Sequence, residues 1–268
     1  FRKVSVIVPA YNEEVSIAQC IDMLSRLDYP DYEIIIVNDG SKDNTLLKLH
    51  SVIDFKISET KNEMSLNTAE IKSVYHNNDG KIILIDKNNG GKADSINAGI
   101  NYSTGEFICT IDADSILDES SLKKVIMPMI MDKRVFVTGG QIAISNDTVI
   151  ENNKIVNFRM PGNIWVLWQI TEYIKSFLVS RISLSKLNSL LIMSGAFSVY
   201  RKTDLMNTGG FLTARNDHKY LREIFKTKKE TVCEDMEIVV RLWRYYHENN
   251  IPGRVVYLAK PLCWTEAP

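Results

Sequence analysis

Several common signatures are missing from this chain, and each absence excludes a class of protein. The four cysteines form no C-x-x-C pair, and Cys109 falls in a predicted core strand, which favours reduced thiols over a disulfide framework. No apolar run approaches the roughly 18 to 20 residues that a membrane span needs. No signal peptide is expected, because Phe1-Arg-Lys leads straight into a predicted strand. With a formal net charge of −1, the chain lacks a polyanion-binding signature, and we expect no nucleic-acid partner.

Common catalytic motifs are absent as well. There is no G-x-S-x-G elbow, which argues against a serine hydrolase, and the four histidines form no H-E-x-x-H pair. The chain contains no P-loop, and no G-x-G-x-x-G follows a strand, so a dinucleotide-dependent dehydrogenase is not indicated.

The chain does have the composition and pattern of an α/β domain. Of its 268 residues, 45% are hydrophobic and 24% charged, which suits one large α/β domain. Apolar patterning predicts strands at 4–8, 32–37, 82–85, 107–111 and 135–138, with helices near 15–24, 92–102, 120–131, 164–178 and 235–246. This alternation predicts a mostly parallel central sheet flanked by helices. We expect a single domain over 1–268.

Polar clusters follow three of the predicted strands. Tyr11, Asp39 and Asp112 each come after the end of a different strand. Ligands of parallel sheets bind beyond the carboxyl ends of the strands, so these clusters are expected to meet at one edge.

The Asp112-Ala-Asp114 segment is the strongest single signal. In extended backbone alternate side chains point the same way, which would aim both carboxylates at one place. Such hard oxygen ligands suit Mg²⁺ or Mn²⁺ shared with substrate phosphates, whereas an ordinary turn is the alternative.

Three other segments each allow a functional and a structural interpretation. Asp39 can accept from a nucleobase or ribose, or form an Asx turn or helix cap. Lys92 follows a Gly-Gly turn at a predicted helix start and can bind phosphate, or be a solvated lysine beside a capped turn. Asp235 opens a helix and is either a general base or an N-terminal cap.

Taken together, the ordered motifs resemble the family 2 inverting glycosyltransferases with the GT-A fold. The matching segments are Val-Pro-Ala-Tyr-Asn-Glu13, Asn-Asp-Gly-Ser41, Asn-Gly-Gly-Lys-Ala-Asp94 with Asn97-Ala-Gly99, Asp112-Ala-Asp114, Ser194-Gly-Ala-Phe197, Gly209-Gly-Phe211 and Glu234-Asp235. Gln169-x-x-Glu172-Tyr173 and Trp264-Thr-Glu-Ala-Pro268 resemble the processive, membrane-embedded branch that includes cellulose, hyaluronan and poly-N-acetylglucosamine synthases.

The resemblance implies a nucleotide-sugar-binding half at 1–115, an acceptor-binding half at 116–268, and a role for each matching position. Ala10, Tyr11 and Glu13 would line the nucleobase pocket, Asp39 would contact uridine, and Lys92 would face the nucleotide. Asp112 would bind the ribose or diphosphate side, and Asp114 would hold the metal. Asp235 would be the catalytic base, and the acceptor would lie against Ser194, Gly195, Ala196 and Glu234.

The implied activity is transfer of a sugar, with inversion, from UDP-GlcNAc or UDP-glucose to the hydroxyl of a growing polysaccharide, with Mg²⁺ or Mn²⁺ as cofactor. Two alternatives remain open. One is a non-processive family 2 transferase that adds a single sugar to a lipid or glycan. The other is a catalytically silent nucleotide-sugar-binding domain.

The chain departs from the family pattern in three ways. It shows no Gln-x-x-Arg-Trp motif and no flanking membrane helices, so we expect a catalytic domain on the cytoplasmic face of a longer protein of the cell membrane. Cys233 stands where threonine is commoner. The stretches 50–78 and 213–230 look long, and the basic second stretch is either a solvated loop or a contact with anionic lipid.

Trp165 and Trp168 recur at helical spacing, which is typical of a core face. The resemblance also allows them to stack on sugar or to form an exposed apolar surface.

Overall fold

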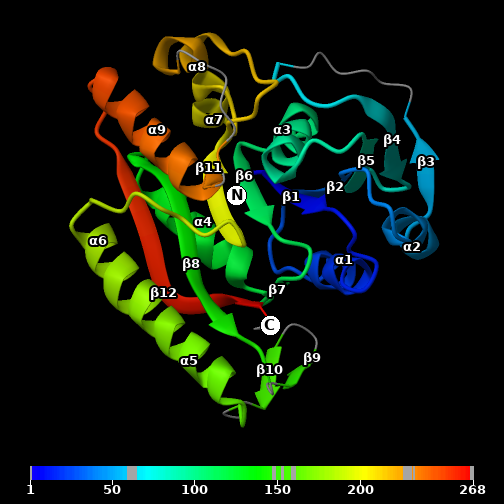
Figure 1. Cartoon of the computed structure of the whole chain (residues 1–268), viewed down its shortest axis with the longest axis horizontal. Coiled ribbons are helices and arrows are strands. Elements are labelled where there is room, and N and C mark those ends of the chain that lie inside the picture. Colours follow the sequence, from blue (N-terminus) through cyan, green and yellow to red (C-terminus); the bar gives the residue numbers. More distant parts are fainter. Residues whose placement is uncertain are drawn as a thin grey trace.

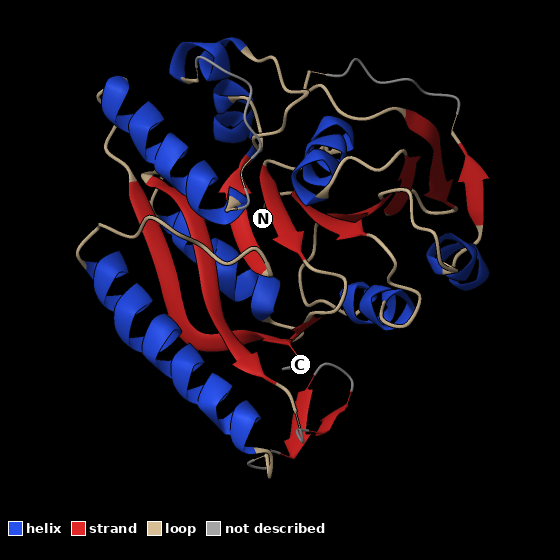
Figure 2. Cartoon of the chain, in the orientation of Figure 1, coloured by secondary structure: helices blue, strands red, loops and turns tan. Residues whose placement is uncertain are grey.

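The chain folds around one large sheet with helices packed against it (Figures 1 and 2). The computed structural model describes residues 2–58, 65–146, 149–151, 154–157, 161–225, 231 and 233–265. In this part of the chain ten strands form the main sheet, in the order β3-β4-β5-β2-β1-β6-β11-β8-β12-β7. The expected α/β domain with a central sheet is confirmed, and its architecture is that of a mixed sheet.

The strands of the main sheet are β1 (Val4–Ala10), β2 (Tyr32–Asn38), β3 (Phe55–Ile57), β4 (Ile71–Asn77), β5 (Ile82–Lys87), β6 (Phe107–Ile111), β7 (Ile116–Leu117), β8 (Val135–Ile144), β11 (Phe197–Arg201) and β12 (Arg254–Thr265). A separate hairpin contains β9 (Val149–Glu151) and β10 (Lys154–Asn157). The helices are α1 (Ile17–Ser25), α2 (Thr45–Val52), α3 (Lys92–Tyr102), α4 (Ser121–Met131), α5 (Ile164–Tyr173), α6 (Ile182–Lys186), α7 (Lys202–Thr208), α8 (Lys219–Ile224) and α9 (Glu234–Glu248), with a π-helical stretch, η1 (Ile174–Arg181), joining α5 to α6.

Four neighbouring parallel strands lie within residues 1–115. Strands β5, β2, β1 and β6 lie side by side and run in the same direction. β2 is buried along its whole length, which explains its unbroken apolar run from Ile34 to Val37. Because these strands are parallel, their carboxyl ends share one edge of the sheet.

The other part of the sheet departs from the parallel pattern. β11 pairs antiparallel with both β6 and β8, whereas β12 pairs parallel with β8. The sequence analysis did not assign β11 as a strand, because its five residues are too few to establish a period. This antiparallel strand starts where β6 ends, and that reversal brings the two halves of the domain together at one point.

The helix predicted at 164–178 forms, but its two tryptophans do not face the core. α5 continues into η1 at Ile174, and Trp165 and Trp168 are 75% and 68% exposed. The core expectation for these tryptophans was therefore wrong, and the alternative of an exposed apolar surface is correct. Among the described residues, no helix combines the length and the hydrophobicity that crossing a bilayer requires.

The two long polar stretches are partly ordered into elements. The first contributes the end of α2 together with β3 and β4, and its residues 59–64 lie outside the described part. The second contains α8, and its residues 226–230 lie outside the described part. Arg215 lies near Asp94, at 3.9 Å, and Arg222 near Asp217, at 3.8 Å, so two of its cations have acidic neighbours within the domain. The final Glu-Ala-Pro of the chain also lies outside the described residues.

Candidate active site

A cleft opens at the carboxyl ends of the parallel strands. The register pairs Ala10 of β1 with Asn38 of β2, and Asn38 with Asp86 of β5, so the residues that follow these strands gather at one edge. The cleft has a volume of about 510 Å³. Its walls include all seven residues assigned to the donor and metal by resemblance: Ala10, Tyr11, Glu13, Asp39, Lys92, Asp112 and Asp114.

Asp112 and Asp114 both line the cleft, but their surroundings differ. β6 ends at Ile111, and the backbone then turns, with Ser115 N donating to Asp112 O at 3.0 Å. The extended geometry that the sequence analysis assumed is therefore wrong here. Asp112 is half-buried beside Lys92, while Asp114 is exposed in the cleft and forms no ion pair or hydrogen bond with other described residues.

Lys92 lies at the start of α3, as predicted, directly after the Gly-Gly turn. Its Nζ is 2.5 Å from Asp112 Oδ1. Burial works against the charge of Lys92, but the neighbouring carboxylates of Asp112 and Asp235 outweigh it and raise the pKa of the lysine. Lys92 therefore remains a cation at neutral pH, at a helix N-terminus that already favours anions.

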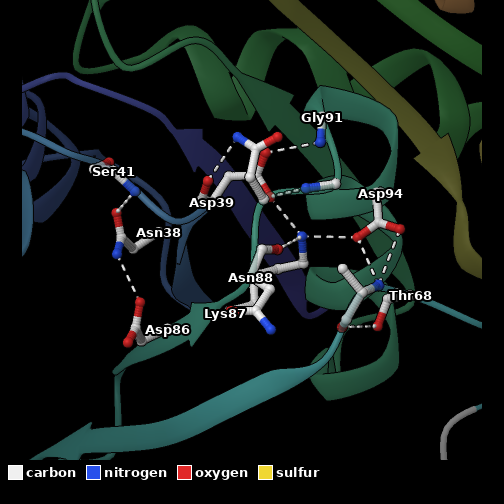
Figure 3. Close-up of polar contacts among 12 residues, drawn as sticks. Asn38, Asp39, Ser41, Thr68, Asp86, Lys87, Asn88, Gly91 and Asp94 are labelled. Atoms are coloured by element: carbon white, nitrogen blue, oxygen red, sulfur yellow. Dashed lines mark hydrogen bonds and ion pairs between the residues drawn. The ribbon is translucent and has the colours of Figure 1, made fainter.

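Asp39 is buried at the edge of the cleft, and its carboxylate is occupied by the protein itself (Figure 3). It accepts from Lys87 Nζ at 2.5 Å, Gly90 N at 3.0 Å and Gly91 N at 2.8 Å. Asp39 thus caps α3 from another segment rather than forming an Asx turn with its own backbone. Gly40 lets this approach occur, because a Cβ there would lie 2.8 Å from Asn89 N.

Three residues assigned to the donor side remain. Tyr11 supplies an aromatic ring, Glu13 supplies a carboxyl group, and Ala10 forms part of the wall. Tyr11 is 43% exposed, an aromatic face that can stack on a planar base. Glu13 accepts from the Ser16 hydroxyl at 2.6 Å, and burial raises its pKa. Ala10 ends β1 with almost no exposure, so it contributes shape rather than a polar contact.

The predicted acceptor residues reach the same region through β11. Because this strand runs antiparallel to β6, the residues before it lie beside the end of β6, and Asp112 N donates to Ala196 O at 3.4 Å. Gly195 N donates to Asp235 Oδ2 at 2.8 Å. Ser194 lies directly before this contact in the chain, and Glu234 and Asp235 open α9 as predicted.

Asp235 is held in a setting that favours its neutral form. Burial raises its pKa, the charge of Lys92 offsets part of this, and Glu234 and Asp112 add to the rise. A carboxylate with a raised pKa is a stronger base than an ordinary aspartate, which is what proton abstraction from a hydroxyl requires.

Gly195 is a position where the backbone must approach a side chain closely. A Cβ built there would lie 2.6 Å from both carboxylate oxygens of Asp235. We therefore expect Gly195→Ala to displace Asp235 and to lower the rate of the catalysed reaction by about 100-fold, because misplacing a reacting group by about 1 Å has that effect. Ligand affinity of the donor cleft should stay unchanged. Steady-state kinetics measures the loss of rate, and nucleotide titration measures the loss of affinity. Equal losses of rate and affinity would contradict this expectation.

A clamp that the sequence analysis did not identify joins the helices of the two halves. Asn97 of α3 exchanges hydrogen bonds with the backbone of Phe211, at 2.8 and 2.7 Å. Arg241 of α9 donates to Thr208 O and Gly210 O and pairs with Glu237 at 2.6 Å. The segment between α7 and α8 thus ties the helix that carries Lys92 to the helix that carries Asp235. Asn97 and Phe211 lie in two of the motifs named above, but the contact between them could not be predicted from the sequence.

Comparison with known protein families gives a match over most of the chain. The pattern of the family described as "Glycosyl transferase family 2" matches residues 5–209, which is most of the chain and includes the whole cleft. The chain belongs to glycosyl transferase family 2. Its family and its GT-A-like fold were therefore correctly predicted from the sequence.

Curated relatives of this family 2 domain include enzymes of polysaccharide synthesis. Poly-beta-1,6-N-acetyl-D-glucosamine synthase of Staphylococcus epidermidis is 24% identical over 265 residues, which cover 99% of this chain and 50% of that protein. The probable glycosyltransferase YdaM of Bacillus subtilis is 26% identical over 271 residues, 98% of this chain and 52% of that protein. The chain thus spans about half the length of these relatives.

Solved structures share the fold. The mannosyltransferase PcManGT of Pyrobaculum calidifontis, in complex with GDP-Man and Mn²⁺, superposes with a TM-score of 0.63 at 18% identity, covering 100% of this chain and 57% of that one. TarS 1-349 of S. aureus in complex with UDP-GlcNAc gives 0.57 at 19% identity, covering 99% of this chain and 59% of that one.

The donor set of the family 2 cleft suits a hard divalent cation. The exposed Asp114 carboxylate has no competing partner among the described residues, and Asp112 and Glu13 line the same cleft. No group of three or more acidic, histidine or cysteine side chains is arranged as a metal site in the described ranges. Mg²⁺ and Mn²⁺ bind through one or two carboxylates and take their other ligands from water and substrate phosphates, so the carboxylates that line this cleft suit either ion.

Proposed function

We propose that this domain transfers a sugar, with inversion, from a UDP-sugar to the hydroxyl of a growing polysaccharide, with UDP-GlcNAc or UDP-glucose as donor. The observation that carries the proposal is the convergence of seven donor-side residues on one cleft, with Asp235 held at its acceptor side. Support for the substrate comes from the poly-beta-1,6-N-acetyl-D-glucosamine synthase relative and from a structural neighbour solved with UDP-GlcNAc.

The donor side of the cleft provides distinct contacts for the base and the diphosphate. The exposed ring of Tyr11 and the carboxylate of Asp39 take the nucleobase end. Lys92, at the N-terminus of α3, contributes positive charge for the diphosphate. Asp114 holds Mg²⁺ or Mn²⁺, which when bound neutralises the diphosphate and so stabilises UDP as the leaving group.

On the acceptor side, Asp235 removes the proton of the attacking hydroxyl. The hydrogen bond from Gly195 N fixes one oxygen of Asp235, and the other remains to accept from the acceptor sugar. The oxygen of the acceptor then forms a bond to the anomeric carbon as the bond to the phosphate oxygen breaks. Attack from the face opposite the leaving group inverts the anomeric carbon without a covalent enzyme intermediate. Ser194, Ala196 and Glu234 flank this position and would line the acceptor path.

The domain would act at the cytoplasmic face of the cell membrane, as the catalytic part of a longer protein. The support is the resemblance to membrane-embedded synthases together with a chain that spans half of its relatives. The exposed Trp165 and Trp168 on α5 are compatible with a neighbouring surface in such a protein.

The proposed function is tested by transfer from UDP-GlcNAc and UDP-glucose to short β-1,6-linked N-acetylglucosamine oligomers in the presence of Mn²⁺. The expected result is release of UDP that depends on both the acceptor and the metal, with the oligomer extended by sugars in β linkage. Equal UDP release with and without acceptor, or transfer from GDP-mannose alone, would contradict the proposal.

A further inference from the structure

Lys87 is a lysine with no exposure at all, at the end of β5. Its ammonium uses all three of its N–H donors inside the protein: Asp39 Oδ1 at 2.5 Å, Asp94 Oδ1 at 2.7 Å and Asn88 O at 2.9 Å. Figure 3 shows this cation between the two carboxylates. A fully buried, fully bonded ammonium holds its partners in one arrangement, because moving either would leave a charge unpaired.

The network leaves Asp39 with little capacity for a ligand. A carboxylate has about four acceptor positions. Oδ1 of Asp39 accepts from both Lys87 and Gly90 N, and Oδ2 accepts from Gly91 N. Counting the described residues, one acceptor position remains, on Oδ2, at a residue that lines the cleft.

A single free acceptor position on Asp39 suits uracil better than guanine. The pairing edge of uracil offers a single N–H between two carbonyl groups. The same edge of guanine offers two neighbouring donors, an imino N–H and an amino group, which are best matched by a carboxylate with both oxygens free. Asp39 in this network can satisfy the single uracil donor but would leave one guanine donor without a partner, and an unmade bond of this kind lowers affinity.

We propose that Lys87 is a specificity-determining residue of the donor site, which occupies Asp39 so that the cleft accepts uridine diphosphate in preference to guanosine diphosphate. This inference rests on the proposed function and deepens it. Lys87 acts through Asp39 and does not itself face the cleft.

Lys87 also holds the start of α3, through its ion pair with Asp94. Asp94, the other partner of Lys87, lies in the first turn of α3 and accepts from Ala69 N at 3.0 Å. Because Lys87 bonds to both Asp39 and Asp94, the Gly-Gly turn that Asp39 caps is held in a fixed position relative to the first turn of α3, which carries Lys92. Lys87 thereby sets the distance between the nucleobase end and the diphosphate end of the cleft.

The test compares UDP and GDP affinities by calorimetric titration with Mn²⁺. Two variants remove the ammonium: Lys87→Met, and Lys87→Met/Asp94→Asn. The double variant keeps the net charge of the network, since two carboxylates and one ammonium become one carboxylate, and so protects folding. Lys72→Met on β4 is the matched control, because this lysine is half-exposed and 3.9 Å from Asp86.

We expect the wild type and the Lys72 variant to prefer UDP over GDP, and this preference to fall by roughly tenfold in folded Lys87 variants, the worth of one hydrogen bond. An unchanged preference, or equal losses for both nucleotides, overturns the inference and leaves the proposed function standing. A wild type that prefers GDP also overturns it. A folded wild type that binds neither nucleotide overturns the proposed function as well.

Discussion

Replacing Asp235 with asparagine is expected to reduce sugar transfer by about 10²- to 10⁴-fold, the usual contribution of a general base. Asparagine has the same shape and can still accept from Gly195 N through its amide oxygen, so the start of α9 should keep its structure. What is lost is the ability to take a proton from the acceptor hydroxyl. Turnover measured at saturating donor and acceptor reports this loss, and UDP titration should show affinity close to wild type.

The matched control is Glu248→Gln, which makes the same acid-to-amide change at the exposed far end of α9. Its turnover should equal that of the wild type. Two results would contradict the assignment: an Asp235→Asn protein with wild-type turnover, or one in which UDP affinity falls as much as turnover does. The first would revive the alternative of a catalytically silent domain.

Asp114→Ala is expected to lower UDP affinity in the presence of Mn²⁺ by about 100-fold, because metal neutralisation of the diphosphate contributes several kcal/mol. The exposed carboxylate of Asp114 has no structural partner among the described residues, so the fold should tolerate the change. The affinity of the variant should match that of the wild type in EDTA. Titrating UDP into both proteins, with and without the metal, measures the effect.

Asp22→Ala is the control for this experiment, because Asp22 is an exposed carboxylate on α1 that pairs with Arg26, the residue directly after that helix. UDP binding by this variant should keep its full dependence on Mn²⁺. Metal-dependent binding that survives in Asp114→Ala would assign the metal to other carboxylates, with Asp112 and Glu13 the nearest candidates in the cleft.

The sequence was sufficient to predict the parallel strands and the edge of the sheet at which their carboxyl ends meet. Runs such as 32–37 are apolar without interruption, because parallel strands are covered on both faces, and this pattern is legible in one chain. The polar residues that follow such strands then fall at a shared edge for geometrical reasons. Hence all seven donor-side residues assigned by motif line one cleft.

What the sequence could not show was which partners these residues have. Lys87 and Asp94 lie five and two residues from Lys92 in the chain, yet only the fold reveals that they form a buried network with Asp39, 48 residues from Lys87. The turn at Asp112 is a similar case, since two aspartates separated by one residue are compatible with either strand or turn. β11 was missed because a short antiparallel strand carries too few residues to establish a period.

The exposed tryptophans of α5 show another limit of prediction from the sequence. Helical spacing of large apolar residues indicates a shared face, and Trp165 and Trp168 do share one, but spacing cannot say what covers it. In the described domain that face lies open, which the core interpretation failed to anticipate.

The most direct test of the central claim is a calorimetric titration of UDP into the wild-type domain with Mn²⁺, repeated in EDTA. The account predicts saturable binding with one site per chain that weakens strongly when the metal is removed, because Asp114 would hold a cation that offsets the charge of the diphosphate, while Lys92 and Asp39 would contact the two ends of the nucleotide. A correctly folded domain that fails to bind UDP, or that binds equally well in EDTA, would contradict the assignment of this cleft as a metal-dependent donor site.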